Sequence, residues 1–155
     1  MTHRPFLISW SNAVFLVDVN VLVYAHRADT PDHSRYREWL ESVVNADSAY
    51  GMSDLVLSGF LRIVTHPRVF REPSPLDKAL SFATQLREHQ NCVFIRPGDR
   101  HWDIFQRICH DSGVKGNLVS DAFFAALAIE SGCVWVTTDR DYARFRGLQL
   151  RHPLD

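Results

Sequence analysis

Short apolar runs rich in β-branched and aromatic residues recur along the chain. The first, "AVFLV" at 13–17, has no alternating polar positions, and this pattern is typical of a strand buried on both faces of a sheet. The other runs predict further strands, the last of them at an edge of the sheet, at 48–53, 92–95, 133–138 and 148–151.

Between these runs, apolar residues recur at the spacing of amphipathic helices. Helices are predicted at 19–26, 30–44, 54–64, 99–113, 120–132 and 141–145, with one more starting at Ser74 and Pro75. We expect Thr30 and Asp99 to cap two of them and Gly132 to end another. The side chains expected to point inward are Tyr36, Trp39, Leu40, Val43, Val44, Leu76, Leu80, Ala83, Leu86, Trp102, Phe105, Ile108 and Cys109.

The alternation of strands and helices predicts an α/β fold, with a mostly parallel sheet and helices on both of its faces. We expect one domain over 14–155, preceded by an N-terminal extension at 1–13. Open sheets of this class place their sites at the carboxyl ends of the strands.

Composition fits a soluble globular protein, with 46% hydrophobic and 23% charged residues. No stretch is long enough to span a membrane, and the apolar patch "FLISW" near the start is too short for a signal peptide. Cys92, Cys109 and Cys133 form no CxxC pair. We therefore expect buried, reduced thiols in a cytoplasmic protein.

The net charge of −1 excludes a general basic field, but 15 of the 17 basic residues are arginines, which favour forked contacts with phosphate. Two groups stand near the acids described next, where they would rim an acidic pocket or equally form solvated helix faces: Arg62, Arg68 and Arg71, and Arg140, Arg144 and Arg146.

Three aspartates are predicted to meet at one edge of the sheet. Asp18 and Asp139 directly follow predicted strands, and Asp121 lies in the first turn of the helix that leads back into the strand before Asp139. A crossover helix runs antiparallel to its strand, so its N-terminus lies at the carboxyl edge. Helix capping accounts for each acid alone, but not for their convergence.

Converging carboxylates repel each other and need compensating positive charge. Arginine would serve, but several oxygen ligands favour a hard divalent cation, Mg²⁺ or Mn²⁺, which binds phosphate oxygens and activates water. Asn20, Thr137 and Thr138 stand close in sequence to the acids and are candidates to hold them in place.

Four segments carry a resemblance to a known family: "FLVDVNVLVYAHR", "LSGFLRIVTHPRVF", "GNLVSDAFFAALAIESGCVWVTTDRDYARF" and the "HPL" near the end. Over about residues 14 to 154 the chain resembles PIN-domain proteins, and more narrowly the VapC toxins of bacterial toxin–antitoxin pairs, in the group abundant in mycobacteria. The resemblance implies a three-layer α/β/α sandwich and a Mg²⁺- or Mn²⁺-dependent endoribonuclease that acts on RNA. Such proteins are often homodimers and are held inactive by a cognate antitoxin.

On this resemblance Asp18, Asp121 and Asp139 match family acids, which makes them the candidate catalytic residues and metal ligands, and Asp141 falls on a frequent accompanying position. The family usually has a glutamate where this chain has Gly59, and Asp54, at the start of the same helix, is a possible substitute.

Two other functions remain open. One is a catalytically weak or inactive PIN-like module that binds RNA or a protein. The other is a phosphohydrolase with Asp18 as nucleophile, although that chemistry favours a second aspartate at position 20, where this chain has Asn20. A dinucleotide site is disfavoured because no GxGxxG follows any predicted strand.

Overall fold

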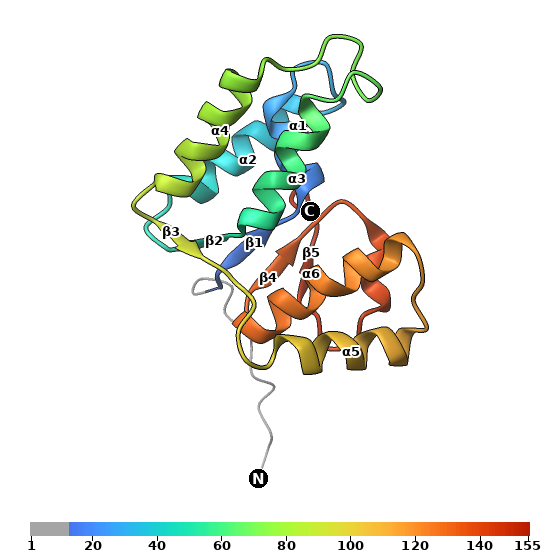
Figure 1. Cartoon of the computed structure of the whole chain (residues 1–155). Coiled ribbons are helices and arrows are strands. Elements are labelled where there is room, and N and C mark those ends of the chain that lie inside the picture. The colour runs from blue at the N-terminus through green and yellow to red at the C-terminus, as the bar shows by residue number, and fades with distance from the viewer. Residues whose placement is uncertain (1–12) are drawn as a thin grey trace.

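The computed structural model describes residues 13–155, so all of the predicted N-terminal extension except Ala13 lies outside the described residues. Five strands form one sheet in the order β3-β2-β1-β4-β5 (Figure 1). Their bounds are β1 Phe15–Val17, β2 Tyr50–Met52, β3 Cys92–Phe94, β4 Val134–Val136 and β5 Leu150–Arg151. The described strand pairs are all parallel, which confirms the predicted sheet.

The strand ends are held in register up to the carboxyl edge. β1 pairs with β4 through Leu16 and Trp135, and the N–H of Asp18 donates to the carbonyl of Val136 at 2.9 Å. On the other side of β4, the N–H of Thr137 donates to the carbonyl of Arg151 at 3.0 Å. The residues that directly follow β1 and β4 therefore start from fixed positions.

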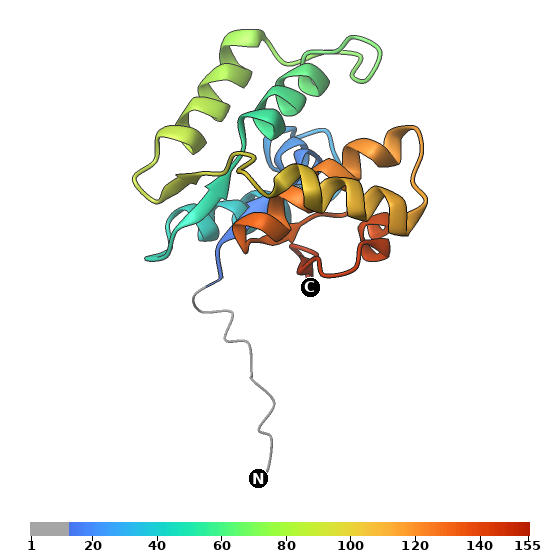
Figure 2. The same cartoon turned by 60° about the horizontal axis from the view of Figure 1, so that its bottom comes forward.

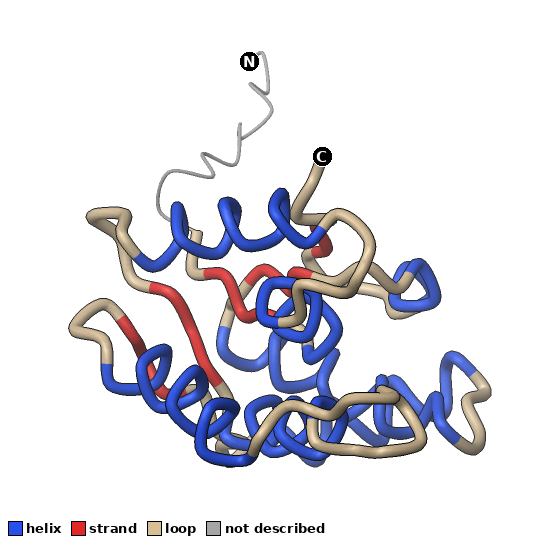
Figure 3. Tube along the Cα trace, turned by 90° about the horizontal axis from the view of Figure 1, so that it is seen from above, coloured by secondary structure: helices blue, strands red, loops and turns tan. Residues whose placement is uncertain are grey.

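Helices cover both faces of the sheet, which lies between them when the molecule is seen from above (Figure 3). On one face Trp39 approaches Phe15, with ring centres 6.2 Å apart, and on the other Phe124 stacks on Trp135 at 5.4 Å. The helices are α1 Val19–His26, α2 His33–Val44, α3 Asp54–Val64, α4 Leu76–Glu88, α5 His101–Ser112, α6 Asn117–Ser131 and the 3₁₀ helix η2 Arg140–Arg144. α5 and α6 lie side by side (Figure 2).

Three predicted helix starts are wrong. The Thr30 hydroxyl donates to the carbonyl of Arg27 at 2.6 Å instead of capping, and α2 begins after Asp32, whose φ is 57°. Asp99 does not cap α5, which follows Arg100. α6 begins three residues before the predicted Ser120, after Gly116, whose φ of 62° favours glycine.

The predicted inward face of α4 is confirmed at Ala83 and Leu86, which are buried, and wrong at Leu76 and Leu80, which are 57% and 41% exposed. Ala79 is buried instead of the two leucines. Small alanine side chains allow the helix to approach its neighbours closely, so the buried stripe passes through Ala79 and Ala83.

The predictions for α5 and for the cysteines hold only in part. Ile108 is buried as predicted, but Trp102 is 64% exposed and the adjacent His101 is buried instead. Cys133 is buried as expected, but Cys92 and Cys109 are only half-buried. No helix within residues 13–155 is both long and apolar enough to cross a membrane.

Candidate functional site

One pocket at the carboxyl edge of the sheet brings the three predicted acids together. It has a volume of about 400 Å³ and lies where α1, α3 and α6 meet the residues after β4. Its lining includes Asp18, Asp121 and Asp139, together with Asn20, Gly59, Arg62, Ser120, Phe124 and Tyr142. We call it the acid pocket.

Asp18 is the most buried of these acids, with 6% of its surface exposed. The backbone N–H of Val19 donates to its Oδ1 and the Thr137 hydroxyl donates to its Oδ2, both at 2.6 Å. Burial, and to a smaller extent the neighbouring Asp121 and Asp139, raises the pKa of Asp18 to about 6, against the opposing effect of these hydrogen bonds. An ionised Asp18 thus needs positive charge nearby.

Thr137 connects Asp18 with Asp139. While its hydroxyl donates to Asp18, its oxygen accepts the backbone N–H of Asp139 at 3.0 Å. Asp139 in turn accepts the N–H of Asp141 at 2.9 Å and so caps η2. Asp18 and Asp139 therefore cap α1 and η2 and also converge in the acid pocket, so helix capping and convergence are compatible.

Asp121 is one turn deeper in α6 than predicted, since the helix starts at Asn117. The Tyr142 hydroxyl donates to its Oδ1 at 3.2 Å. Burial raises the pKa of Asp121, and burial together with the nearby acids raises that of Tyr142, which keeps the phenol protonated as a donor. Sequence reasoning missed Tyr142; its place three residues after Asp139 was the only available signal.

The donor set of the acid pocket fits a hard divalent cation. In the described part of the chain, no lysine, arginine or histidine forms an ion pair with Asp18, Asp121 or Asp139. Unpaired carboxylate oxygens in a partly buried pocket are the ligands that Mg²⁺ and Mn²⁺ prefer. Among residues 13–155, no three acidic, histidine or cysteine side chains already form a closed metal-binding group, so the role of the three acids as ligands stays a prediction.

Neither Asp54, the possible substitute for the missing glutamate, nor Asp141, which could also replace it, lines the acid pocket. Arg87 donates to Asp54 at 2.8 Å, and Asp141 lies 3.7 Å from Arg144. Gly59 does line the pocket, and a Cβ placed there would come within 3.1 Å of Val19 Cγ2. A longer side chain at this position therefore requires a small shift of Val19.

The predicted arginine rim is divided among separate surfaces. Arg62 lines the acid pocket, while Arg140 lines a neighbouring cavity. Arg144 and Arg146 line a third cavity, between α5 and the residues around η2. Arg68 and Arg71 are exposed on the loop after α3.

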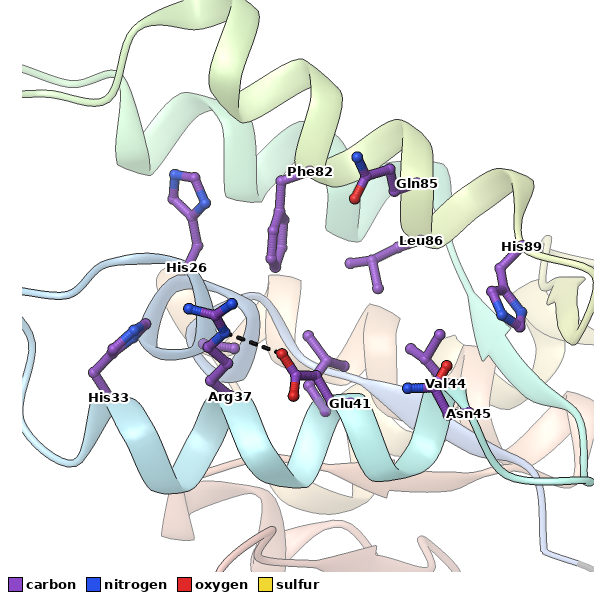
Figure 4. Close-up of a pocket in the computed structure, with 12 residues that line it drawn as sticks. His26, His33, Arg37, Glu41, Val44, Asn45, Phe82, Gln85, Leu86 and His89 are labelled. Atoms are coloured by element: carbon purple, nitrogen blue, oxygen red, sulfur yellow. Dashed lines mark hydrogen bonds and ion pairs between the residues drawn. The ribbon is translucent and has the colours of Figure 1, made fainter.

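A further groove of about 420 Å³ lies between α2 and α4, away from the acids (Figure 4). Leu40, Val44, Phe82 and Leu86 contribute apolar surface to it. Polar side chains also line it, among them the ion pair of Arg37 with Glu41 at 3.0 Å.

Comparison with known families identifies the family of the chain. The model of the PIN domain family matches residues 15–148, a range that includes all three acids. This chain belongs to the PIN-domain family. This membership accounts for the fold.

Two ribonucleases of Mycobacterium tuberculosis are similar to nearly the whole chain. The PIN domain is 47% identical over 139 residues to ribonuclease VapC43 of Mycobacterium tuberculosis, covering 90% of this chain and 95% of that protein. It is 37% identical over 142 residues to ribonuclease VapC25 of the same species, covering 91% and 100%.

Solved structures share the fold at low sequence identity. VapBC2 from Rickettsia felis, bound to a DNA fragment from its promoter, has a TM-score of 0.65 and 17% identity, over 90% of this chain and 98% of that chain. M. tuberculosis VapC20, described as a toxin that cleaves the sarcin–ricin loop, has a TM-score of 0.59 and 14% identity, over 87% and 98%.

Proposed function

We propose that this PIN domain is an endoribonuclease, the toxin of a type II toxin–antitoxin pair, that hydrolyses RNA phosphodiester bonds with the help of Mg²⁺ or Mn²⁺. The observation that carries the proposal is the acid pocket, in which Asp18, Asp121 and Asp139 lie together and form no ion pair among the described residues. The mycobacterial relatives named as VapC ribonucleases support the same activity.

The three aspartates would hold the cation. When bound, it supplies Lewis-acid activation of water and of a phosphate oxygen. Asp18 is fixed by two hydrogen bonds, so its carboxylate keeps one orientation. Tyr142 orients Asp121, and Thr137 ties Asp18 to the backbone that carries Asp139. Arg62, on the wall of the same pocket, is placed to contact the negatively charged substrate.

Metal removal tests the proposal. The purified protein with Mg²⁺ or Mn²⁺ is expected to cut single-stranded RNA, and excess EDTA should abolish cleavage until the cation is restored. In the absence of RNA, Mg²⁺ should also raise the melting temperature of the protein, because a ligand bound only by the folded state stabilises it. If RNA is shifted on a gel but left intact with either cation, the inactive binding module is favoured instead. That alternative is supported by Gly59, which stands where the family usually has a glutamate.

Thr137 is expected to act as a positioning residue. Thr137→Val preserves the shape but removes the hydroxyl that contacts Asp18 and Asp139, so cleavage should fall about 10- to 100-fold and the Mg²⁺ concentration for half-maximal activity should rise. Thr137→Ser, which keeps the hydroxyl, should restore most of the activity. Thr84→Val, at an exposed position on α4, is the matched control. Unchanged Mg²⁺ dependence in Thr137→Val would contradict this role.

We also propose that this protein forms a homodimer and that a cognate antitoxin inhibits it. VapBC structures among the structural neighbours support an antitoxin partner. The groove between α2 and α4, with apolar Leu40 and Phe82 in its lining, is a suitable surface for the apolar face of a peptide segment (Figure 4).

A further inference from the structure

A second cavity adjoins the acid pocket on the side of β5. Its volume is about 710 Å³, and its walls come from the start of α2, the residues between β4 and η2, and the C-terminal residues from Leu150 onward. The chain returns to the carboxyl edge of the sheet at its end, as Figure 1 shows. Asp139 lines both cavities. An extended polymer with one phosphate at the acids can therefore continue into the second cavity, which we call the β5 cavity.

Arg151 is held in place on the wall of the β5 cavity. Its backbone carbonyl accepts the N–H of Thr137 at 3.0 Å, which joins it to the residue that contacts Asp18. Its guanidinium carbon lies 5.1 Å from the centre of the Phe15 ring, a cation–π contact that limits the motion of the side chain. No carboxylate within residues 13–155 forms an ion pair with it.

Arg140 supplies a second positive charge. It directly follows Asp139, is exposed at the start of η2, and lines the same cavity. Like Arg151, it has no ion-pair partner in the described part of the chain. Of the acids on the cavity wall, Asp32 lies 3.9 Å from Arg35, Asp155 lies 4.0 Å from His152, which offsets its charge only when protonated, and Asp139 is one of the proposed cation ligands. Arg140 and Arg151 are the two arginines of this wall that form no ion pair among the described residues.

The chemistry of these two arginines fits a phosphate of the nucleic-acid backbone. A guanidinium presents its N–H groups in a planar fork that matches phosphate oxygens, and most polar contacts to nucleic acids are made to the backbone. A volume of about 710 Å³ is also within the usual range for small-ligand sites and is sufficient for one nucleotide.

We propose that the β5 cavity binds the RNA nucleotide next to the scissile phosphodiester, and that Arg140 and Arg151 contact its phosphate. The proposal rests on the ribonuclease function proposed above. It assigns opposite charges to adjacent cavities: carboxylates where the cation binds, and guanidinium groups where the substrate chain continues.

The test measures RNA binding without cleavage. A fluorescent single-stranded RNA is titrated with protein in EDTA at several salt concentrations. The variants are Arg140→Gln, Arg151→Met and the double variant; methionine at 151 retains an apolar stem over Phe15. Each single change should weaken binding about 3- to 10-fold at low salt, and should lower the slope of log Kobs against log salt by about 0.7, the value for one lost contact with a single strand. The double variant should lose about twice that slope.

Arg100→Gln is the control. Arg100 is also exposed, but its backbone N–H donates to Glu130 near the end of α6, which places it at the opposite edge of the sheet from Asp121. This variant should bind as the wild type does. A folded double variant with wild-type affinity and salt slope would overturn the proposal. If Arg151→Met does not fold, Arg140→Gln, at an exposed position, still tests the proposal. An unchanged salt slope in this variant counts against the proposal, and a reduced salt slope supports it. Because nothing is cleaved in EDTA, the result is separate from that of the ribonuclease test.

Discussion

Asp18→Asn is expected to lower RNA cleavage at least about a hundredfold, and Asp121→Asn to do the same. Each change removes one carboxylate from the acid pocket and with it an attraction for the cation, whose stabilisation of transition-state charge is worth several kcal/mol. The substitution at Asp18 should not unfold the protein. Asparagine retains an oxygen that can accept the Val19 N–H, and it removes a charge that burial disfavours.

The measurement is initial cleavage rate at saturating Mg²⁺, with thermal unfolding followed in parallel. Asp103→Asn is the matched control, because Asp103 is an exposed acid in the first turn of α5 and does not line the acid pocket. Undiminished cleavage by folded Asp18→Asn or Asp121→Asn would contradict the assigned site. Loss of the Mg²⁺-induced rise in melting temperature in these variants, and not in Asp103→Asn, would separate cation binding from other causes of inactivity.

The convergence of the three acids could be predicted because it depends on topology alone. Parallel strands with crossover helices place the residue after β1, the residue after β4 and the start of α6 at one edge, whatever the details of packing. α3 was also predicted with its observed bounds, because its periodic apolar run begins at once after the preceding strand. Ser53, predicted as the last residue of that strand, accepts the N–H of Leu55 at 3.2 Å and caps the helix.

Features that depend on tertiary contacts could not be read from the sequence. The start of α6 was misplaced because Ser120 carries a stronger capping signal than Gly116, yet the backbone turns at Gly116. The hydrogen bond from Tyr142 to Asp121 and the β5 cavity both require the C-terminal segment to lie against elements more than a dozen residues away. No local pattern records such an approach.

Trp135→Ala is expected to lower the free energy of unfolding by about 3–5 kcal/mol, a large share of the total stability of a domain of this size. Trp135 is fully buried in β4, where its ring stacks on Phe124 at 5.4 Å and lies 5.5 Å from Tyr142. Because these two neighbours also line the acid pocket, the cavity left by the indole should loosen the site as well as the core. Urea unfolding followed by circular dichroism measures the loss.

Trp135→Phe should cost clearly less than Trp135→Ala, for a reason beyond its smaller change in volume. The indole Nε1 of Trp135 is buried and has no hydrogen-bond partner in the described residues, and such an unmet donor costs about 1–3 kcal/mol. Phenylalanine removes this donor while it keeps an aromatic ring against Phe124. Trp102→Ala, which truncates a 64% exposed indole, is the control and should change stability by under about 1 kcal/mol. Equal losses in Trp135→Phe and Trp135→Ala would contradict this account, because a ring retained against Phe124 and a removed unpaired donor should both favour phenylalanine over alanine.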